Sequence, residues 1–160
     1  MRKDASAFLV ILFWSNAGAF CLHLFDETFI GGGFVAGVQR HFWPAYAANK
    51  FLAVNAVLLV LIAAGNALYH WQGSRLILLP AVWVWERFLN CLWHVVWTIH
   101  FKEYSPGLVT SGLFFAIFCL LYHYGVRQGR IKPAVFYGAG LIAFLLEVLL
   151  LSSLWWARKI

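Results

Sequence analysis

Charged side chains are scarce in this sequence: Asp, Glu, Lys and Arg make up 11% of its 160 residues, while 63% are hydrophobic. A soluble domain carries about a quarter charged residues, so this composition excludes that class. The formal charge of +6 is typical of a membrane protein with basic loops, and we see no nucleic-acid-binding pattern. The sequence predicts an all-α polytopic membrane helix bundle that forms one domain over residues 1–160.

Several motifs of common enzyme classes are also missing. The three cysteines, Cys21, Cys91 and Cys119, stand alone in apolar stretches, without the paired spacing of a metal knuckle or a redox motif. The sequence contains no P-loop, no CxxCH haem attachment motif and no Gly-x-Ser-x-Gly nucleophile elbow. Histidines and carboxylates therefore remain as the candidates for chemistry. The sequence does not indicate an oligomeric state.

Five hydrophobic stretches predict transmembrane helices, at residues 6–24, 51–71, 76–101, 108–126 and 133–156. The third exceeds the ~20 residues that a bilayer requires, so we expect it to tilt or protrude. Residues 28–50 contain a GGG run and a Trp-Pro step and are too polar to span, which predicts an interfacial or re-entrant connector. Ala17-Gly18-Ala19 resembles a signal-peptide cleavage site, but we expect the first stretch to remain as a helix.

Basic residues distinguish the two sides of the membrane only slightly. Five spans would put both termini on opposite sides, with six Lys and Arg on the amino-terminal side (Arg2, Lys3, Arg75, Arg127, Arg130, Lys132) and five on the other (Arg40, Lys50, Lys102, Arg158, Lys159). Because cytoplasmic loops are enriched in Lys and Arg, this split favours a cytoplasmic amino terminus in the cell inner membrane.

Polar residues form a stripe within the third stretch. Glu86, Asn90 and His94 are spaced four apart and share one helix face, although such groups are costly at membrane depth unless they face a bundle interior or a wet cavity. Arg87 is offset from Glu86 by about 100°, so we expect it to pair with a carboxylate of another helix, Glu147 or Glu27. The other interpretation of these charges is a buried ion-pair network that fixes helix packing.

A second polar group stands at the end of the first stretch. His23, Asp26 and Glu27 have the spacing i, i+3 and i+4, so their side chains project from one side of a helix and can bind zinc or iron, or exchange a proton. An acidic cap at the membrane surface is the other interpretation. Because the first and third helices end on the same side, we expect His23, Glu27 and His94 to converge near the YSPG turn.

The sequence HLFDE, a later histidine and the YSPG turn together resemble the HXXEE family of small membrane proteins. That family is marked by an HxxEE motif, a second histidine and a YxPG motif, which correspond here to His23, Glu27, His94, Tyr104, Pro106 and Gly107. Asp26 stands where the family has its first glutamate, which keeps the charge but shortens the side chain. The similarity runs from His23 to about Thr110 and, by length and hydropathy, extends over the chain. The family has no established function, so the chemistry must come from the residues.

The residues favour an intramembrane enzyme that acts on a lipid or another hydrophobic small molecule, with membrane lipids as its surroundings. Its metal, zinc or iron, would be held by His23, Glu27 and His94. The predicted catalytic residues are Glu27, His94 and Glu86; the predicted substrate-binding residues are Asn90, Trp93, Trp97 and Tyr104; and Asp26 and Glu147 would orient the others. Two alternatives remain open: a metal-free isomerase that shuttles protons between His and Glu, and a non-enzymatic carrier or lipid-binding protein.

Overall fold

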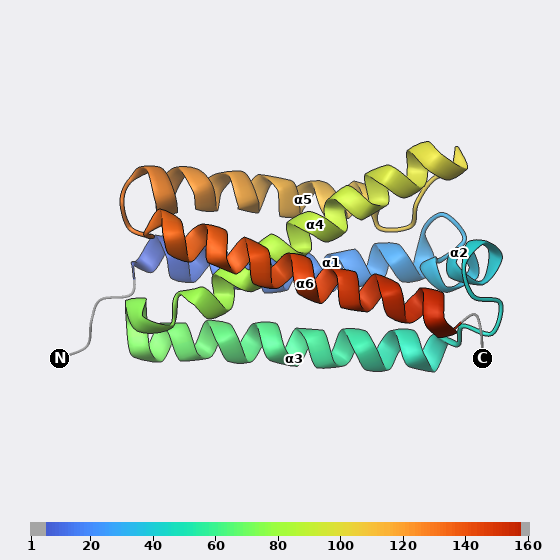
Figure 1. The fold of residues 1–160 in the computed structure, drawn as a ribbon, viewed down its shortest axis with the longest axis horizontal. Coiled ribbons are helices and arrows are strands. Elements are labelled where there is room, and N and C mark those ends of the chain that lie inside the picture. The colour runs from blue at the N-terminus through green and yellow to red at the C-terminus, as the bar shows by residue number, and fades with distance from the viewer. Residues whose placement is uncertain (1–5, 158–160) are drawn as a thin grey trace.

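The computed structural model describes residues 6–157, and within that range the secondary structure is entirely helical (Figure 1). The elements in chain order are α1 (Ala7–Phe29), α2 (Phe34–His41), α3 (Ala48–Gln72), η1 (Gly73–Leu76), α4 (Leu78–Phe101), α5 (Leu108–Leu120), η2 (Leu121–Arg127) and α6 (Pro133–Ala157). The predicted all-α bundle is therefore confirmed, and the five predicted stretches correspond to α1, α3, α4, the continuous α5–η2 segment and α6. Helix α1 extends a full turn beyond residue 24, so the HLFDE motif is helical.

The long helices alternate in direction along the chain. Helix α1 begins at one end of the bundle and α6 ends at the other, with α3 and α5 running opposite to α1, α4 and α6 (Figure 1). The carboxyl ends of α1 and α4 and the start of α5 consequently lie at one end of the molecule. The terminal residues used for orientation, Arg2, Lys3, Arg158 and Lys159, lie outside the described residues.

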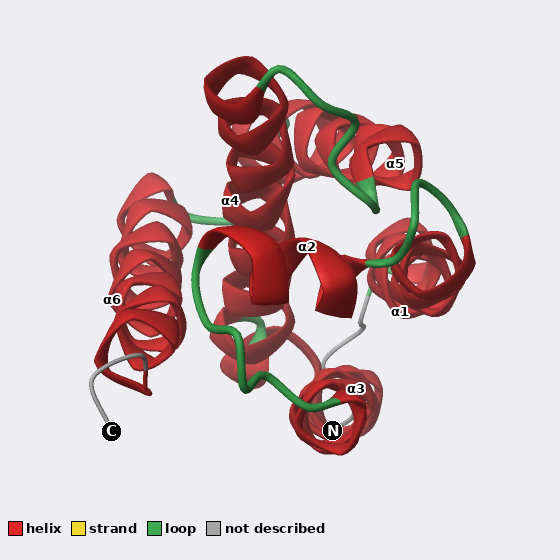
Figure 2. Cartoon of the chain, turned by 90° about the vertical axis from the view of Figure 1, so that its right-hand side faces the viewer, coloured by secondary structure: helices red, strands yellow, loops and turns green. Residues whose placement is uncertain are grey.

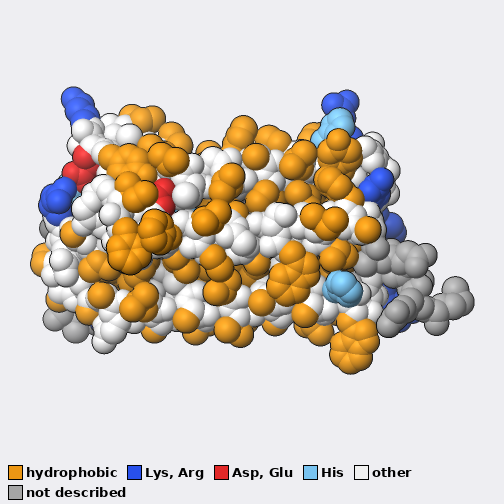
Figure 3. All heavy atoms as spheres, turned by 180° about the vertical axis from the view of Figure 1, so that it is seen from behind, with side chains coloured by type: hydrophobic (Ala, Val, Ile, Leu, Met, Phe, Trp, Pro, Cys, Tyr) orange, Lys and Arg blue, Asp and Glu red, His pale blue; other side chains and the backbone are white. Residues whose placement is uncertain are grey.

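Four helical segments are long and apolar enough to cross a bilayer, which makes this a membrane protein: Ala7–Phe29, Ala48–Leu76, Leu108–Arg127 and Pro133–Ser152. Helix α4 has 24 residues but is not among these segments, and the predicted total of five spans is not confirmed. Its polar stripe explains the difference, because Glu86, Arg87, Asn90 and His94 lower its hydropathy. Lys and Arg side chains gather at the two ends of the bundle, and hydrophobic side chains cover the face between them (Figure 3).

Residues 28–50 form a connector at the end of the bundle. Gly31, Gly32 and Gly33 have φ angles of 64°, 84° and 84°, a conformation that ends α1 and that other residues rarely adopt. The eight residues of α2 then lie across the bundle end, in front of α4 and next to α1 (Figure 2). This helix is too short to span a bilayer.

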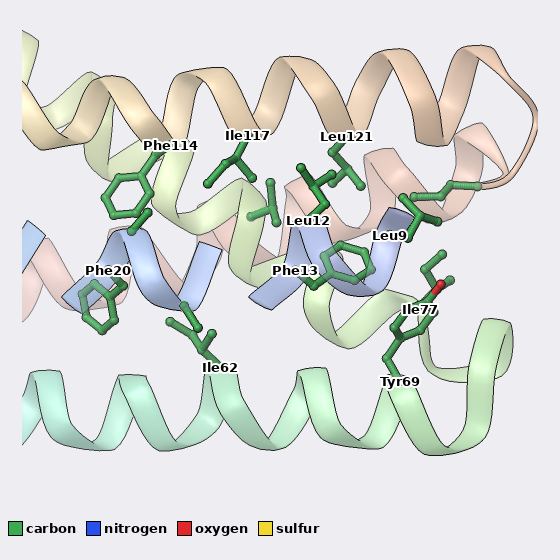
Figure 4. Close-up of a cluster of buried hydrophobic side chains, with 14 of the residues drawn as sticks. Leu9, Leu12, Phe13, Phe20, Ile62, Tyr69, Ile77, Phe114, Ile117 and Leu121 are labelled. Atoms are coloured by element: carbon green, nitrogen blue, oxygen red, sulfur yellow. The ribbon is translucent and has the colours of Figure 1, made fainter. Parts of the chain in front are cut away.

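Apolar packing holds α1 between α3 and α5. Leu9, Leu12 and Phe13 of α1 face Ile62 and Tyr69 of α3 on one side, and Phe114, Ile117 and Leu121 of the α5–η2 segment on the other (Figure 4). The Phe13 and Tyr69 rings meet edge to face at 5.1 Å, and Asn66 Nδ2 donates a hydrogen bond to the Phe13 carbonyl at 2.9 Å. This packing fixes α1 so that its last two turns meet α4.

Candidate functional site

His23 and Glu27 on α1 and His94 on α4 meet in the interior of the bundle. The two imidazole rings lie with their centroids 4.9 Å apart, and their Nε2 atoms are 3.5 Å (His23) and 3.6 Å (His94) from the same oxygen, Glu27 Oε1. Both histidines are fully buried and Glu27 is 5% exposed. One ligand atom from each of the three residues lies within 4.8 Å of the other two. The structure thus brings together the three residues that the sequence assigned to a metal.

The two Nε2 atoms are buried and have no hydrogen-bond partner. A buried polar atom left unpaired costs about 1–3 kcal/mol, so such an atom calls for an explanation. Zinc bonds to nitrogen and oxygen measure about 2.0–2.2 Å, which puts neighbouring tetrahedral ligands about 3.3–3.6 Å apart. The observed separations of 3.5 and 3.6 Å fit a shared metal ion and exceed those of direct hydrogen bonds.

The outer nitrogen of His23 is held by Thr110 at the start of α5. His23 Nδ1 lies 3.1 Å from Thr110 Oγ1, which donates its only proton either to Asp26 Oδ2 at 2.8 Å or to the Gly107 carbonyl at 3.2 Å. In both cases the hydroxyl oxygen must accept the Nδ1 proton of a neutral His23. The lone pair of that imidazole is then on Nε2, the atom that faces Glu27, as metal binding requires.

Asp26 and Ser105 complete the surroundings of the two histidines. Asp26 also accepts hydrogen bonds from the Thr110 backbone N–H at 3.1 Å and from the Tyr104 hydroxyl at 2.9 Å. Ser105 Oγ lies 2.8 Å from His94 Nδ1. Asp26 and Tyr104 therefore act on His23 through Thr110 and do not touch the Nε2 atoms. Sequence reasoning assigned no role to Thr110 or Ser105, whose only signal was their position: Ser105 lies within the YSPG turn and Thr110 shortly after it.

Gly107 of the YSPG turn closes directly over the three residues. Its φ angle is 101°, and an added Cβ would lie 2.6 Å from His23 Cε1, 2.8 Å from His94 Cε1 and 3.0 Å from Glu27 Cγ. Those distances are shorter than non-bonded carbon atoms allow, and the positive φ independently disfavours other residues. This glycine therefore lets the turn approach the site and exclude water from its outer side.

A cavity of about 480 Å³ begins at Glu27 and extends between α3, α4 and α6. Five residues predicted for the site line it: Glu27, Glu86, Asn90, Trp93 and Glu147. Tyr104 and Trp97 do not. Trp97 is instead packed against Gly37 of α2, where an added Cβ would lie 2.8 Å from the indole ring, and it donates a hydrogen bond from Nε1 to Glu103 at 3.2 Å.

Arg87 pairs with its sequence neighbour, and the prediction that a carboxylate of another helix neutralises it was wrong. Arg87 Nε donates to Glu86 Oε2 at 2.5 Å, and Nη2 donates to Glu86 Oε1. The two Cβ atoms leave the helix in different directions, but both side chains are long enough to bend into the cavity, where the guanidinium also covers the Phe20 ring at 4.4 Å. Both carboxylate oxygens of Glu86 are thus occupied, while Glu147 of α6 interacts electrostatically with the pair.

Glu103 ties α2 to the end of α4 outside the apolar core. It accepts hydrogen bonds from Arg40 at 2.8 Å and pairs with His41 at 2.7 Å. Desolvation alone would raise the pKa of Glu103, but the hydrogen bonds from His41 and Trp97 and the charge of Arg40 hold it below its ordinary value. This contact keeps α2, and with it Phe34 on the cavity wall, against the bundle.

The fold and the site together define a helical membrane protein with a buried His, Glu, His cluster beside a cavity. The chain belongs to the HXXEE family: the family described as "Protein of unknown function with HXXEE motif" matches residues 14–122, which confirms the resemblance seen in the sequence. The matched range contains His23, Glu27, His94 and the YSPG turn. The comparisons with curated proteins and with solved structures found no match.

Proposed function

We propose that the protein is an intramembrane enzyme that acts on a lipid or another hydrophobic small molecule with the help of a metal ion held by His23, Glu27 and His94. The observation that carries the proposal is the pair of buried, unpartnered Nε2 atoms that face one oxygen of Glu27. Two imidazoles and a carboxylate are the ligand set of several catalytic zinc sites, which leave a fourth position for water or substrate. Zinc or iron suits these donors.

The roles of the neighbouring residues follow from their contacts. A bound metal would supply a Lewis acid or an activated water. Thr110 and Ser105 orient the two imidazoles, and Asp26 and Tyr104 hold Thr110 in place. Glu27 also lines the cavity, so a substrate lying there would meet the metal from the side of α3 and α6.

The membrane arrangement proposed for this enzyme has five spans. Helices α3 and α5 run in the same direction, so a chain that crosses the bilayer in both of them has to cross back in α4. The polar stripe of α4 faces the cavity and the interior, where Glu86, Arg87 and His94 are buried, and this is how intramembrane charges are tolerated. We further propose a cytoplasmic amino terminus in the cell inner membrane, from the distribution of Lys and Arg.

Elemental analysis of the purified protein tests the metal. The wild type and the variants Glu27→Gln, His94→Ala and His100→Ala would each be stripped with chelator, incubated with zinc or iron, and desalted. We expect close to one ion per chain in the wild type and in His100→Ala, whose histidine is exposed near the end of α4, and none in the other two variants. Equal metal in all four proteins, or none in any, would overturn the proposal and favour a metal-free proton shuttle or a carrier.

A further inference from the structure

The cavity beside Glu27 has a polar end and apolar sides. Its polar end is formed by Glu27, Glu86, Arg87, Asn90 and Glu147, whereas its sides include Phe34, Phe51, Leu58, Trp93 and Leu151. A volume of about 480 Å³ lies in the lower half of the range of about 300–1,000 Å³ that small-molecule sites occupy. This size and this division of polarity suit an amphiphile with one chain better than a two-chain lipid.

The polar end offers more acceptors than donors. Arg87 directs both Nε and Nη2 at Glu86, so these donors are already used. Asn90 Oδ1 is buried and has no hydrogen-bond partner, and the carboxylates of Glu27 and Glu147 also line the cavity. Burial and the negative charge of Glu27 raise the pKa of Tyr46, on the same wall, to about 12, so this hydroxyl stays neutral. A ligand that supplies a proton donor would satisfy the unpaired oxygen.

A headgroup that donates a hydrogen bond fits the polar end better than an anionic one. Five charged residues line the cavity: the carboxylates Glu27, Glu86 and Glu147 and the basic groups Arg87 and Lys50. A carboxylate or a phosphate dianion has only acceptors, so it would leave Asn90 Oδ1 unpaired and would face the oxygens of Glu27. A hydroxyl group supplies a donor and adds no charge in a site of low dielectric.

The cavity reaches the lipid-facing surface between α3 and α6. Ala53 and Val54 of α3 line it and are also exposed, Val54 by 44%, and Leu151 of α6 lines the opposite side. Seen from the end that carries α2, α6 lies on the left of α4 and α3 lies below it (Figure 2). A molecule dissolved in the bilayer would therefore meet the opening directly, without passing through water.

We propose that this cavity binds a single-chain amphiphile with an uncharged hydroxyl headgroup, such as a long-chain alcohol, which enters from the bilayer between α3 and α6 and places its hydroxyl at Glu27 and Asn90. The inference rests on the proposed function because it names the substrate class of that site. It stands on the shape of the cavity and on the unpaired acceptor at its polar end.

Photolabelling of the protein in phosphatidylcholine nanodiscs tests the inference, with dodecanol that carries a terminal diazirine as the probe. We expect the label on peptides of α3 and α6, with competition by dodecanol but not by dodecyl phosphate. Leu58→Trp, which fills the cavity, should lose the label, and Leu61→Trp, on the exposed face of the same helix, should keep it. Equal competition by dodecyl phosphate, or unchanged labelling of Leu58→Trp, would overturn the inference.

A second variant, Asn90→Leu, tests the inference independently in case Leu58→Trp does not fold. Asn90→Leu removes the unpaired acceptor and keeps the approximate shape, so labelling by the alcohol should fall while labelling by dodecane with the same diazirine should not. An equal effect on both probes contradicts the role of the hydroxyl. Labelling that survives in metal-free protein supports the ligand class even if the metal proposal fails. If the protein binds zinc but takes no label, the proposed metal site stands and the proposed ligand class is refuted.

Discussion

Replacing Thr110 with Val tests whether the hydroxyl between Asp26 and His23 prepares the histidine for a metal. Thr110 Oγ1 lies 3.1 Å from His23 Nδ1 and donates to Asp26 at 2.8 Å. Without it, the Nδ1 proton of a fully buried imidazole has no acceptor, and neither the tautomer nor the ring orientation is fixed. Loss of such a contact lowers metal affinity by about 10–100-fold, which corresponds to about 1.4–2.7 kcal/mol. We expect this decrease for zinc in Thr110→Val.

Competition with a chromophoric zinc chelator measures the affinity, and Thr110→Ser is the matched control because it keeps the hydroxyl. Thermal unfolding of the metal-free proteins has to be measured in parallel, since the unpaired polar atoms left by Val also destabilise the fold by about 1–3 kcal/mol. If folded Thr110→Val binds zinc as tightly as the wild type, the orienting role is refuted. A Ser variant as weak as the Val variant would refute it equally, because the hydroxyl would then be irrelevant.

The remaining predictions concern the turn, the buried ion pair and the contact that holds α2. Gly107→Ala should lose metal binding and about 1–3 kcal/mol of stability, as measured by thermal unfolding, because Gly107 has a positive φ and contacts the site. Gly112→Ala is the control: there is open space around Gly112, so this variant should keep both metal binding and stability. Arg87→Leu leaves the buried carboxylate of Glu86 unpaired and should cost about 3–5 kcal/mol in the same assay, more than the double variant Glu86→Gln/Arg87→Leu. The pKa of Glu103 is lowered in the fold, so its ion pairs stabilise the protein above the ordinary pKa of 4.5, and this contribution is lost as the pH falls through the lower folded value. In Glu103→Gln, the unfolding midpoint should therefore depend less on pH across that acid range. A pH profile identical to that of the wild type would contradict this.

Hydropathy and helical spacing were sufficient to predict the long helices and the convergence of His23, Glu27 and His94. Chain direction alone put the ends of α1 and α4 at the same end of the bundle, and the i, i+4 spacing of His23 and Glu27 put both on one helix face. The two hydroxyls that hold the imidazoles could not be found this way, because a single Ser or Thr within or beside a turn has no periodic pattern. Their roles depend on the rotation of α5 against α1.

The partner of Arg87 and the position of Trp97 show a different limit of prediction from the sequence. The angle between Cβ atoms describes where side chains leave a helix, but Arg87 and Glu86 bend toward each other because both avoid lipid and reach the same cavity. Trp93 and Trp97 are one turn apart, yet only Trp93 lines the cavity, since α2 covers Trp97 through Gly37. The docking of α2 is a tertiary contact that the pattern of α4 alone does not encode.

The hydrogen bonds around His23 and His94 also join segments that apolar packing would hold only weakly in a bilayer. Lipid chains are as apolar as leucine side chains, so helices in lipid gain little from burying apolar faces, and polar contacts between them matter more. Thr110 joins the start of α5 to the end of α1, and Ser105 joins the turn to α4. The same atoms thus join the helical segments and orient the two imidazoles. Removing one histidine alone would leave Thr110 or Ser105 without its buried partner, so a contact between the segments would be lost together with the imidazole.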